Sequence, residues 1–168
     1  NYFSSINILS LAAERYFLSK VNEIREGYDL YIKTHPGEEK GLAEIRFEGL
    51  NVKFINNSVP WEVIYLNHIF HHGDDKLVLL APSSTAAHNS ILIGKYFGIN
   101  QCYLVLLVDI LKDYLRVNIL EDDREYIMRF IKVYGRDRVF LPQTFIEAKE
   151  VIRSIFASRP DQIKKIEF

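Results

Sequence analysis

The stretch KLVLLAPSSTAAHNSILIGKYFGINQCYLVLLV, from Lys76 to Val108, carries the pattern that decides the fold. It contains two continuous apolar runs, Lys76–Ala81 and Cys102–Val108, each of strand length. Continuous apolar runs are typical of strands that are buried on both faces of a parallel sheet. Between the two runs, a helix is expected to open at Ser83-Ser84-Thr85 and to close at Gly98. The stretch therefore predicts a parallel β-α-β unit.

The flanking sequence continues this alternation of helices and strands. Strands that alternate with helices of about 10 to 15 residues indicate parallel units with helices on both faces of the sheet. The sequence thus predicts an α/β fold, a Rossmann-like three-layer sandwich with a mostly parallel sheet. The further helices are expected over Ile6–Arg25, Trp61–Phe70, Asp122–Val133 and Thr144–Ala157, with Asp122 and Thr144 as caps; the further strands are expected over Tyr28–Lys33, within Ile45–Ile55 as a strand or a short hairpin, and over Val139–Leu141.

The composition is that of an ordinary globular domain. The chain has 168 residues, of which 48% are hydrophobic and 26% charged, and this length suits about one domain. We expect residues 1–27 to form an N-terminal helix or linker and residues 28–168 to form a Rossmann-like nucleotide-sugar-binding domain. The net charge of -1, without a basic cluster, argues against a nucleic-acid partner. The single cysteine, Cys102, excludes an internal disulfide.

Membrane insertion and secretion are not expected from the sequence. No apolar run approaches the roughly 20 residues of a membrane-spanning helix. The first residues also lack the basic start, apolar stretch and cleavage site of a signal peptide.

Three polar features follow predicted strands, where ligands of such sheets bind. They are Thr34-His35-Pro36-Gly37, Pro82-Ser83-Ser84-Thr85 and Asp109. At the second, three hydroxyls precede a helix whose first N–H groups and dipole favour an anion, so a phosphate fits there. An ordinary helix N-cap explains the same residues, and this alternative stays open.

Two further side chains suit a bound nucleotide. His35 could donate to a phosphate oxygen or protonate a leaving group, because its charge changes near neutral pH. Pro36 would fix the loop and Lys33 would add positive charge. Glu62 could accept hydrogen bonds from ribose hydroxyls. The alternatives are a surface histidine in a turn, and an acid favoured by the helix dipole.

In order along the chain, three segments resemble the C-terminal domain of bacterial sialyltransferases. The group meant contains the lipooligosaccharide sialyltransferases and the capsular polysialyltransferases, which share an HP motif, a Pro-x-Glu segment and a Ser-Ser/Thr motif in this order. The resemblance covers about residues 28–100. The segments are Tyr31-Ile32-Lys33-Thr34-His35-Pro36, Val59-Pro60-Trp61-Glu62-Val63-Ile64 and Ser83-Ser84-Thr85-Ala86.

The resemblance implies the C-terminal half of a GT-B glycosyltransferase that transfers sialic acid from CMP-sialic acid to a surface glycan. It implies neither a metal nor a further cofactor. By resemblance, His35 would be catalytic, contacting the CMP phosphate and helping the nucleotide to leave, while Ser83 and Ser84 hold that phosphate and Glu62 holds the ribose. The candidate donor-binding set is Lys33, Pro36, Glu62, Ser83, Ser84 and Thr85.

The sequence departs from the family pattern at its beginning. The family's acceptor domain and general base precede the HP motif, whereas only 34 residues precede His35 here. The chain is therefore expected to be the donor-binding half of a longer enzyme. Such enzymes are cytoplasmic and work as peripheral proteins at the inner face of the membrane. The first helix is expected to pack on this domain, on another domain, or on a second copy in a homo-oligomer.

Other functions remain open on the sequence alone. One alternative is a transferase that uses another CMP- or CDP-activated donor, such as CDP-glycerol. A second is a non-enzymatic α/β interaction module. A zinc site is not expected at His68, His71 and His72, because no carboxylate or thiol obviously completes the set and Gly73 ends the helix.

Overall fold

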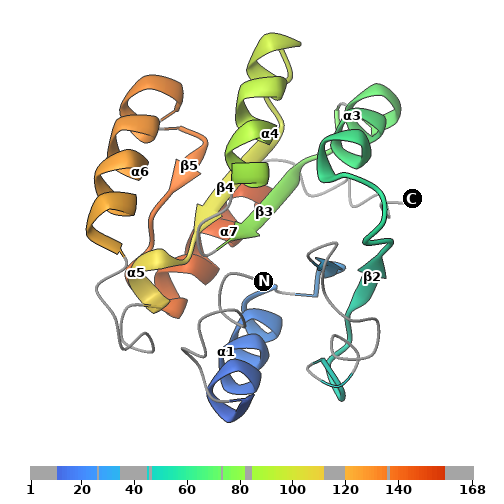
Figure 1. Ribbon diagram of the computed structural model, residues 1–168, viewed down its shortest axis with the longest axis vertical. Coiled ribbons are helices and arrows are strands. Elements are labelled where there is room, and N and C mark those ends of the chain that lie inside the picture. Colours follow the sequence, from blue (N-terminus) through green and yellow to red (C-terminus); the bar gives the residue numbers. More distant parts are fainter. Residues whose placement is uncertain are drawn as a thin grey trace.

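The computed structural model describes residues 11–25, 27–34, 45, 47–72, 74–81, 85–111, 120–135 and 137–157. Helices and strands alternate along the chain (Figure 1). The elements are α1 (Leu11–Ile24), β1 (Tyr31–Lys33), β2 (Lys53–Ile55), α3 (Trp61–His72), β3 (Leu77–Ala81), α4 (Thr85–Tyr96), β4 (Cys102–Leu106), α5 (Val108–Leu111), α6 (Leu120–Tyr134), β5 (Val139–Phe140) and α7 (Phe145–Ala157).

The strands form two small parallel sheets. β1 pairs with β2, and β3, β4 and β5 pair in that order. In the larger sheet, Ala81 at the end of β3 lies opposite Leu106 at the end of β4. Two strands that run side by side in the same direction need a crossover, which α4 supplies between β3 and β4. The predicted α/β fold is confirmed, and the arrangement is compatible with a Rossmann-like fold.

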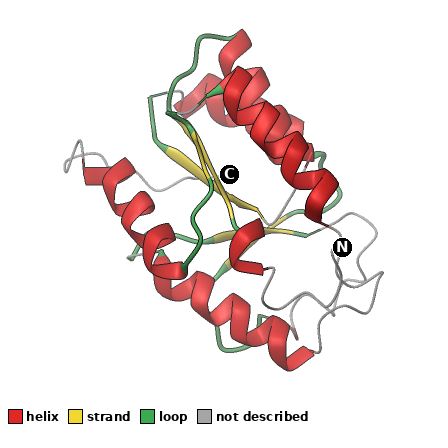
Figure 2. Cartoon of the chain, turned by 90° about the vertical axis from the view of Figure 1, so that its left-hand side faces the viewer, coloured by secondary structure: helices red, strands yellow, loops and turns green. Residues whose placement is uncertain are grey.

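Helices cover both faces of the larger sheet, as Figure 2 shows for its yellow strands. Side chains of β4 alternate between the faces, because successive residues of a strand point in opposite directions. Cys102, Leu104 and Leu106 join a core with residues of α3, α4 and α6. Val105 and the following Leu107 join a second core with residues of α1 and α7. Both faces of the central strand are therefore buried.

The first helix packs on this domain. Phe17, Val21 and Ile24 recur at helical spacing on α1 and are buried in the core that also contains Ile152 of α7. The rings of Phe17 and Phe145 lie 5.6 Å apart, which connects α1 to the first turn of α7. Burying an aliphatic or aromatic side chain of this size stabilises the fold by about 1.5–3 kcal/mol.

The predicted ends of several helices are confirmed. Gly27 follows α1 with a positive φ of 89°, and Gly98 follows α4 with a φ of 71°, a backbone conformation that glycine adopts at little cost. Thr144 caps α7, because its hydroxyl oxygen accepts a hydrogen bond from the backbone N–H of Glu147 at 3.1 Å.

Asp122 does not cap α6, because the helix begins two residues earlier, at Leu120. Acidic residues are favoured throughout a first helical turn by the dipole, so their presence does not fix which residue is the cap. The described residues of the stretch 45–55 contain a single strand and no hairpin. Gly49 turns the chain with a φ of 81°, and Lys53–Ile55 then pairs in parallel with β1.

Two predicted strands are shorter than expected. The strand expected over Tyr28–Lys33 is β1, which begins only at Tyr31. The apolar run Cys102–Val108 changes from strand to helix at its end, since β4 stops at Leu106 and Val108 begins α5. A continuous apolar run suits a buried strand and a buried helix equally, so the sequence could not locate this change.

Candidate functional site

The structure describes three of the seven candidate site residues. Lys33 ends β1, Glu62 lies in the first turn of α3, and Thr85 begins α4. The other four, His35, Pro36, Ser83 and Ser84, lie outside the described residues. The geometry of the site is therefore built from Lys33, Glu62 and Thr85 together with the side chains around them.

The amine of Lys33 is held at the end of β1. Its Nζ atom donates to the carbonyl oxygens of Thr34 at 3.2 Å and Asn57 at 3.0 Å. Partial burial lowers the pKa of this amine, and the nearby Glu62 carboxylate opposes that shift. Thr34 precedes His35 in the sequence, and Asn57 leads into α3. Lys33, within the first segment, thus bonds to the chain just before the second segment.

Glu62 connects the second segment to the third. Its Oε1 atom accepts a hydrogen bond from Nδ2 of Asn89, in the second turn of α4, at 3.4 Å. Its neighbour Trp61 donates from Nε1 to the Ser90 hydroxyl at 2.6 Å, and that hydroxyl donates to the Ala86 carbonyl at 3.0 Å. These contacts hold the beginning of α3 against the beginning of α4.

The structure therefore brings together the described parts of all three segments. The Glu62 carboxylate opposes the lowering of the Lys33 pKa by burial and accepts a hydrogen bond from Asn89. An amine, a carboxylate and an amide within one cluster can bind a ligand that carries both a negative charge and hydroxyl groups. Thr85 is exposed at the adjoining helix start.

Asp109 lies at the carboxyl end of β4, as its position in the sequence predicted. The strand ends are joined there by a hydrogen bond from the N–H of Leu107 to the carbonyl of Ala81, at 2.8 Å. Asp109 is buried, and its Oδ2 atom lies 3.4 Å from Nη2 of Arg124 on α6.

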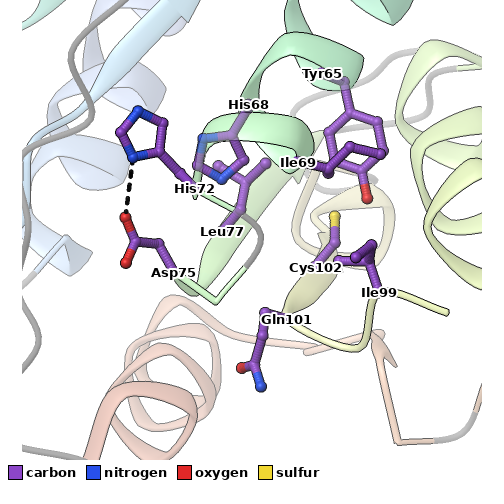
Figure 3. Close-up of a pocket in the computed structure, with 9 residues that line it drawn as sticks. All are labelled: Tyr65, His68, Ile69, His72, Asp75, Leu77, Ile99, Gln101 and Cys102. Atoms are coloured by element: carbon purple, nitrogen blue, oxygen red, sulfur yellow. Dashed lines mark ion pairs between the residues drawn. The ribbon is translucent and has the colours of Figure 1, made fainter. Parts of the chain in front are cut away.

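A separate pocket lies at the opposite end of the sheet, between the last turns of α3 and the beginnings of β3 and β4 (Figure 3). His72 Nδ1 and Asp75 Oδ2 lie 3.5 Å apart at its rim. Figure 3 shows the Tyr65 oxygen directed toward the Cys102 sulfur. Nine residues line the pocket: Tyr65, His68, Ile69, His72, Asp75, Leu77, Ile99, Gln101 and Cys102.

This pocket offers little catalytic chemistry. Burial raises the pKa of the Cys102 thiol to about 12 and raises that of the Tyr65 hydroxyl, so both groups stay protonated and neither is a nucleophile at neutral pH. Asp75 is a carboxylate that the histidine spacing did not reveal. Even so, no three His, Cys, Asp or Glu side chains in the described part of the chain gather as metal ligands.

Sequence reasoning missed three residues of these clusters. Asn89 lies four positions after Thr85, so helical spacing from the predicted helix start could have placed it on the same face. Asn57 acts through its backbone carbonyl, which carries no sequence signal. Arg124 pairs with Asp109 from fifteen positions away, across a connection whose path the sequence does not define.

Comparisons with models of protein families, with curated proteins and with solved structures gave no match for this chain. Fold and site define the class: an α/β chain with parallel sheets and a polar cluster where the end of β1 meets the beginnings of α3 and α4. Within the ranges that the structure describes, no helix combines the length and the apolar character needed to cross a membrane.

Proposed function

We propose that this chain is the donor-binding domain of a sialyltransferase-like glycosyltransferase, which holds CMP-sialic acid for transfer to a surface glycan. In this proposal the domain corresponds to the C-terminal half of a GT-B enzyme. The parallel sheets with helices on both faces support it, because nucleotides bind beyond the carboxyl ends of strands in such folds.

One observation carries the proposal. The described parts of the HP, Pro-x-Glu and Ser-Ser/Thr segments adjoin one another through short hydrogen-bonded links. A single nucleotide can contact all three segments only if they adjoin. Lys33 of the first segment bonds to Asn57, two residues before the second segment. Trp61 of the second segment bonds to Ser90, which in turn bonds to Ala86 of the third.

The chemistry of the donor suits these groups. When sialic acid leaves CMP, the bond from the sugar carbon to the phosphate oxygen breaks and its electron pair stays on the phosphate. Lys33 and the proposed donors His35, Ser83 and Ser84 would stabilise this growing negative charge, which lowers the barrier. The Glu62 carboxylate would accept hydrogen bonds from the ribose. The acceptor hydroxyl would lose its proton to a base on another domain.

The test is the binding of CMP in the presence of a metal chelator, measured by calorimetry and by thermal unfolding. At a CMP concentration of 100 times Kd, the folded state gains about 2.7 kcal/mol, which raises the Tm by several degrees. Glu62→Gln is expected to weaken binding by about 10- to 100-fold, since hydrogen bonds to a charged group are each worth about 1.5–3 kcal/mol.

The matched control for Glu62→Gln is Glu150→Gln, at an exposed position of α7 on the other face of the sheet, which should leave CMP affinity unchanged. Donors other than CMP-sialic acid form a second arm of the experiment. If nucleotide is released from CDP-glycerol and not from CMP-sialic acid, the donor of this chain would be an activated polyol phosphate instead of CMP-sialic acid. A folded chain that binds no cytidine nucleotide would be explained better as a non-enzymatic interaction module.

A further inference from the structure

An ion pair at the carboxyl edge of the larger sheet is not used by the proposed donor contacts. Asp109 lies in the short helix α5, three residues after the end of β4, and its side chain is only 7% exposed. Among the acidic side chains whose burial the structure describes, Asp109 is the one that is buried. A buried carboxylate is costly unless it is paired, so Asp109 fixes the position of its partner, Arg124.

Arg124 presents its charge to solvent. Its side chain, on the second turn of α6, is 52% exposed. Within the described residues, its hydrogen-bond acceptor is Asp109 Oδ2, at 3.4 Å. A guanidinium has five N–H donors in a fixed fork, so one contact leaves most of them available for a second acceptor. The guanidinium of Arg124 is thus positioned by Asp109 and keeps N–H donors for a ligand.

The position of Arg124 relative to Glu62 follows from the contacts of α4. On one side, Asn89 of α4 donates to Glu62 of α3. On the other side, the ring of His88 packs against Tyr126 of α6, with centroids 5.3 Å apart. The first turns of α4 therefore lie between Glu62 and the beginning of α6, which carries Arg124 (Figure 1).

The charges on the two sides of α4 differ in sign. Glu62 offers hydrogen-bond acceptors, which suit hydroxyl groups. Arg124 offers donors and a positive charge, which suit phosphate or carboxylate oxygens. A ligand lying across the beginning of α4 would meet both, with its hydroxyl-bearing part toward α3 and its anionic part toward α6.

We infer that Arg124, oriented by the buried Asp109, binds an anionic oxygen group of the donor while Glu62 binds the ribose. Asp109 is then a positioning residue and Arg124 a binding residue. The inference rests on the proposed cytidine-nucleotide function and deepens it by assigning the direction in which the ligand lies. The anionic group is either the phosphate or the carboxylate of the sugar, and the two are distinguished by experiment.

The experiment compares the affinities of cytidine, CMP and CMP-sialic acid by calorimetry in the full chain. Arg124→Gln is expected to weaken CMP-sialic acid binding by about 10- to 100-fold while cytidine affinity stays constant, because only the anion contact is lost. An equal loss for CMP and CMP-sialic acid identifies the phosphate. A loss confined to CMP-sialic acid identifies the sugar carboxylate. Salt should weaken the wild-type interaction more than that of the variant.

Arg129→Gln is the matched control. Arg129 lies on the same helix, where it pairs with Glu125 and both side chains are mostly exposed, at 75% and 68%. Its removal should change no affinity. Arg124→Gln alone leaves Asp109 buried without a partner and can destabilise the fold. The double variant Asp109→Asn/Arg124→Gln removes both charges, so it leaves no unpaired carboxylate. Its ligand affinities should equal those of Arg124→Gln.

The results separate the inference from the proposed function. If Arg124→Gln and the double variant bind CMP and CMP-sialic acid like the wild type, the inference is wrong and the proposed function stands. If the wild type binds no cytidine nucleotide, the proposed function is wrong. In that case, titration with inorganic phosphate, followed at the Arg124 side-chain NMR signal, tests whether Arg124 binds anions. A saturable shift supports an anion site at Arg124, and the absence of a shift rules it out.

Discussion

At the level of single residues, His68 shows what burial does to a titratable group. Its imidazole is 3% exposed in the last turns of α3. Burial lowers its pKa from the ordinary value of 6.5, the nearby His72 lowers it further, and Asp75 raises it. The neutral imidazole is the form that this packing stabilises.

The stability of the chain should therefore fall in mild acid. Well above pH 6.5, at pH 7.5 for example, His68 is almost entirely neutral in the folded and unfolded states and contributes little pH dependence. As the pH falls through 6.5, the unfolded state binds a proton at His68, whereas the folded state does so only at lower pH because its His68 pKa is lower. The free energy of unfolding therefore decreases. The loss attributable to His68 at pH 5.5 is at most about 1.4 kcal/mol. Urea unfolding of wild type and His68→Gln at pH 7.5 and 5.5 measures it, and the variant should lose less.

His71→Gln provides the comparison, because His71 lies on the same helix but is exposed. This variant should keep the full acid sensitivity of the wild type. Equal acid sensitivity in all three proteins would mean that carboxylates, rather than His68, govern the response.

The candidate site was predictable in part at this scale. The positions of Lys33 at the end of a strand and of Glu62 at the start of a helix followed from local rules, whereas their roles stay a prediction. The partners Asn57 and Arg124 did not, because each is brought in by the tertiary path of a connecting segment. Local sequence patterns contain no information about such paths.

At the level of elements, helix ends were predicted best where two independent signals agree. Thr144 precedes an amphipathic run, and Glu147 follows three positions later, so the start of α7 was predicted correctly. At α6 the acidic residues gave one signal only, and the helix begins earlier than predicted. The parallel pairing of β1 with β2 could not be predicted, because strands of three residues carry too little sequence pattern to define their register.

Thr144→Ala should destabilise the chain by about 1 kcal/mol, because the first N–H groups of α7 lose an acceptor. Chemical unfolding followed by circular dichroism measures the change. Ser154→Ala on the same helix is the control, since that exposed hydroxyl bonds only the carbonyl of Val151 one turn back. Its expected effect is within about 0.5 kcal/mol. Equal effects from the two variants would show that the cap contributes no specific stability.

The approach of α4 to α3 depends on Gly94. A Cβ atom at this position would lie 2.7 Å from the Tyr65 hydroxyl oxygen and 3.3 Å from the Ile99 carbonyl oxygen. Tyr65 is fully buried and has little room to move. Gly94→Ala should therefore destabilise by about 1–3 kcal/mol, even though alanine is the better helix former.

The double variant Gly94→Ala/Tyr65→Phe tests the cause, because it removes the oxygen that the new methyl group would meet. Urea unfolding measures the loss of unfolding free energy in each variant. The loss in the double variant should be smaller than the sum of the losses in the two single variants by about 0.5–3 kcal/mol. Strict additivity would mean that the methyl group is accommodated elsewhere.

At the level of the whole molecule, two cores share one sheet. The core on the α3, α4 and α6 side and the core on the α1 and α7 side meet at β4, whose side chains alternate between them. A substitution that destabilises one core should therefore also lower the stability of the other. The alternation of apolar strands and helices was enough to predict this layered α/β architecture. It was not enough to predict that the larger sheet would have three strands and that β1 and β2 would pair separately.

Phe17→Ala should destabilise the entire chain by about 3–5 kcal/mol, the usual range for a buried aromatic side chain. The single tryptophan, Trp61, lies on the other side of the sheet and reports on the remote core. Its fluorescence and the helical circular dichroism signal should shift to the same lower urea midpoint. Ile146→Ala, at a position on α7 that is 72% exposed, should shift neither. Separate midpoints for the two signals in Phe17→Ala would mean that α1 unfolds independently.

The seclusion of the lone thiol has a practical consequence for labelling. Cys102 is 3% exposed at the start of the central strand and stays protonated at neutral pH, so a maleimide reagent has no thiolate to attack in the native protein. A cysteine placed on the outer surface would then be the sole attachment point for a dye or spin label. Pairs of such labels could follow distances in solution without any replacement of the native residue.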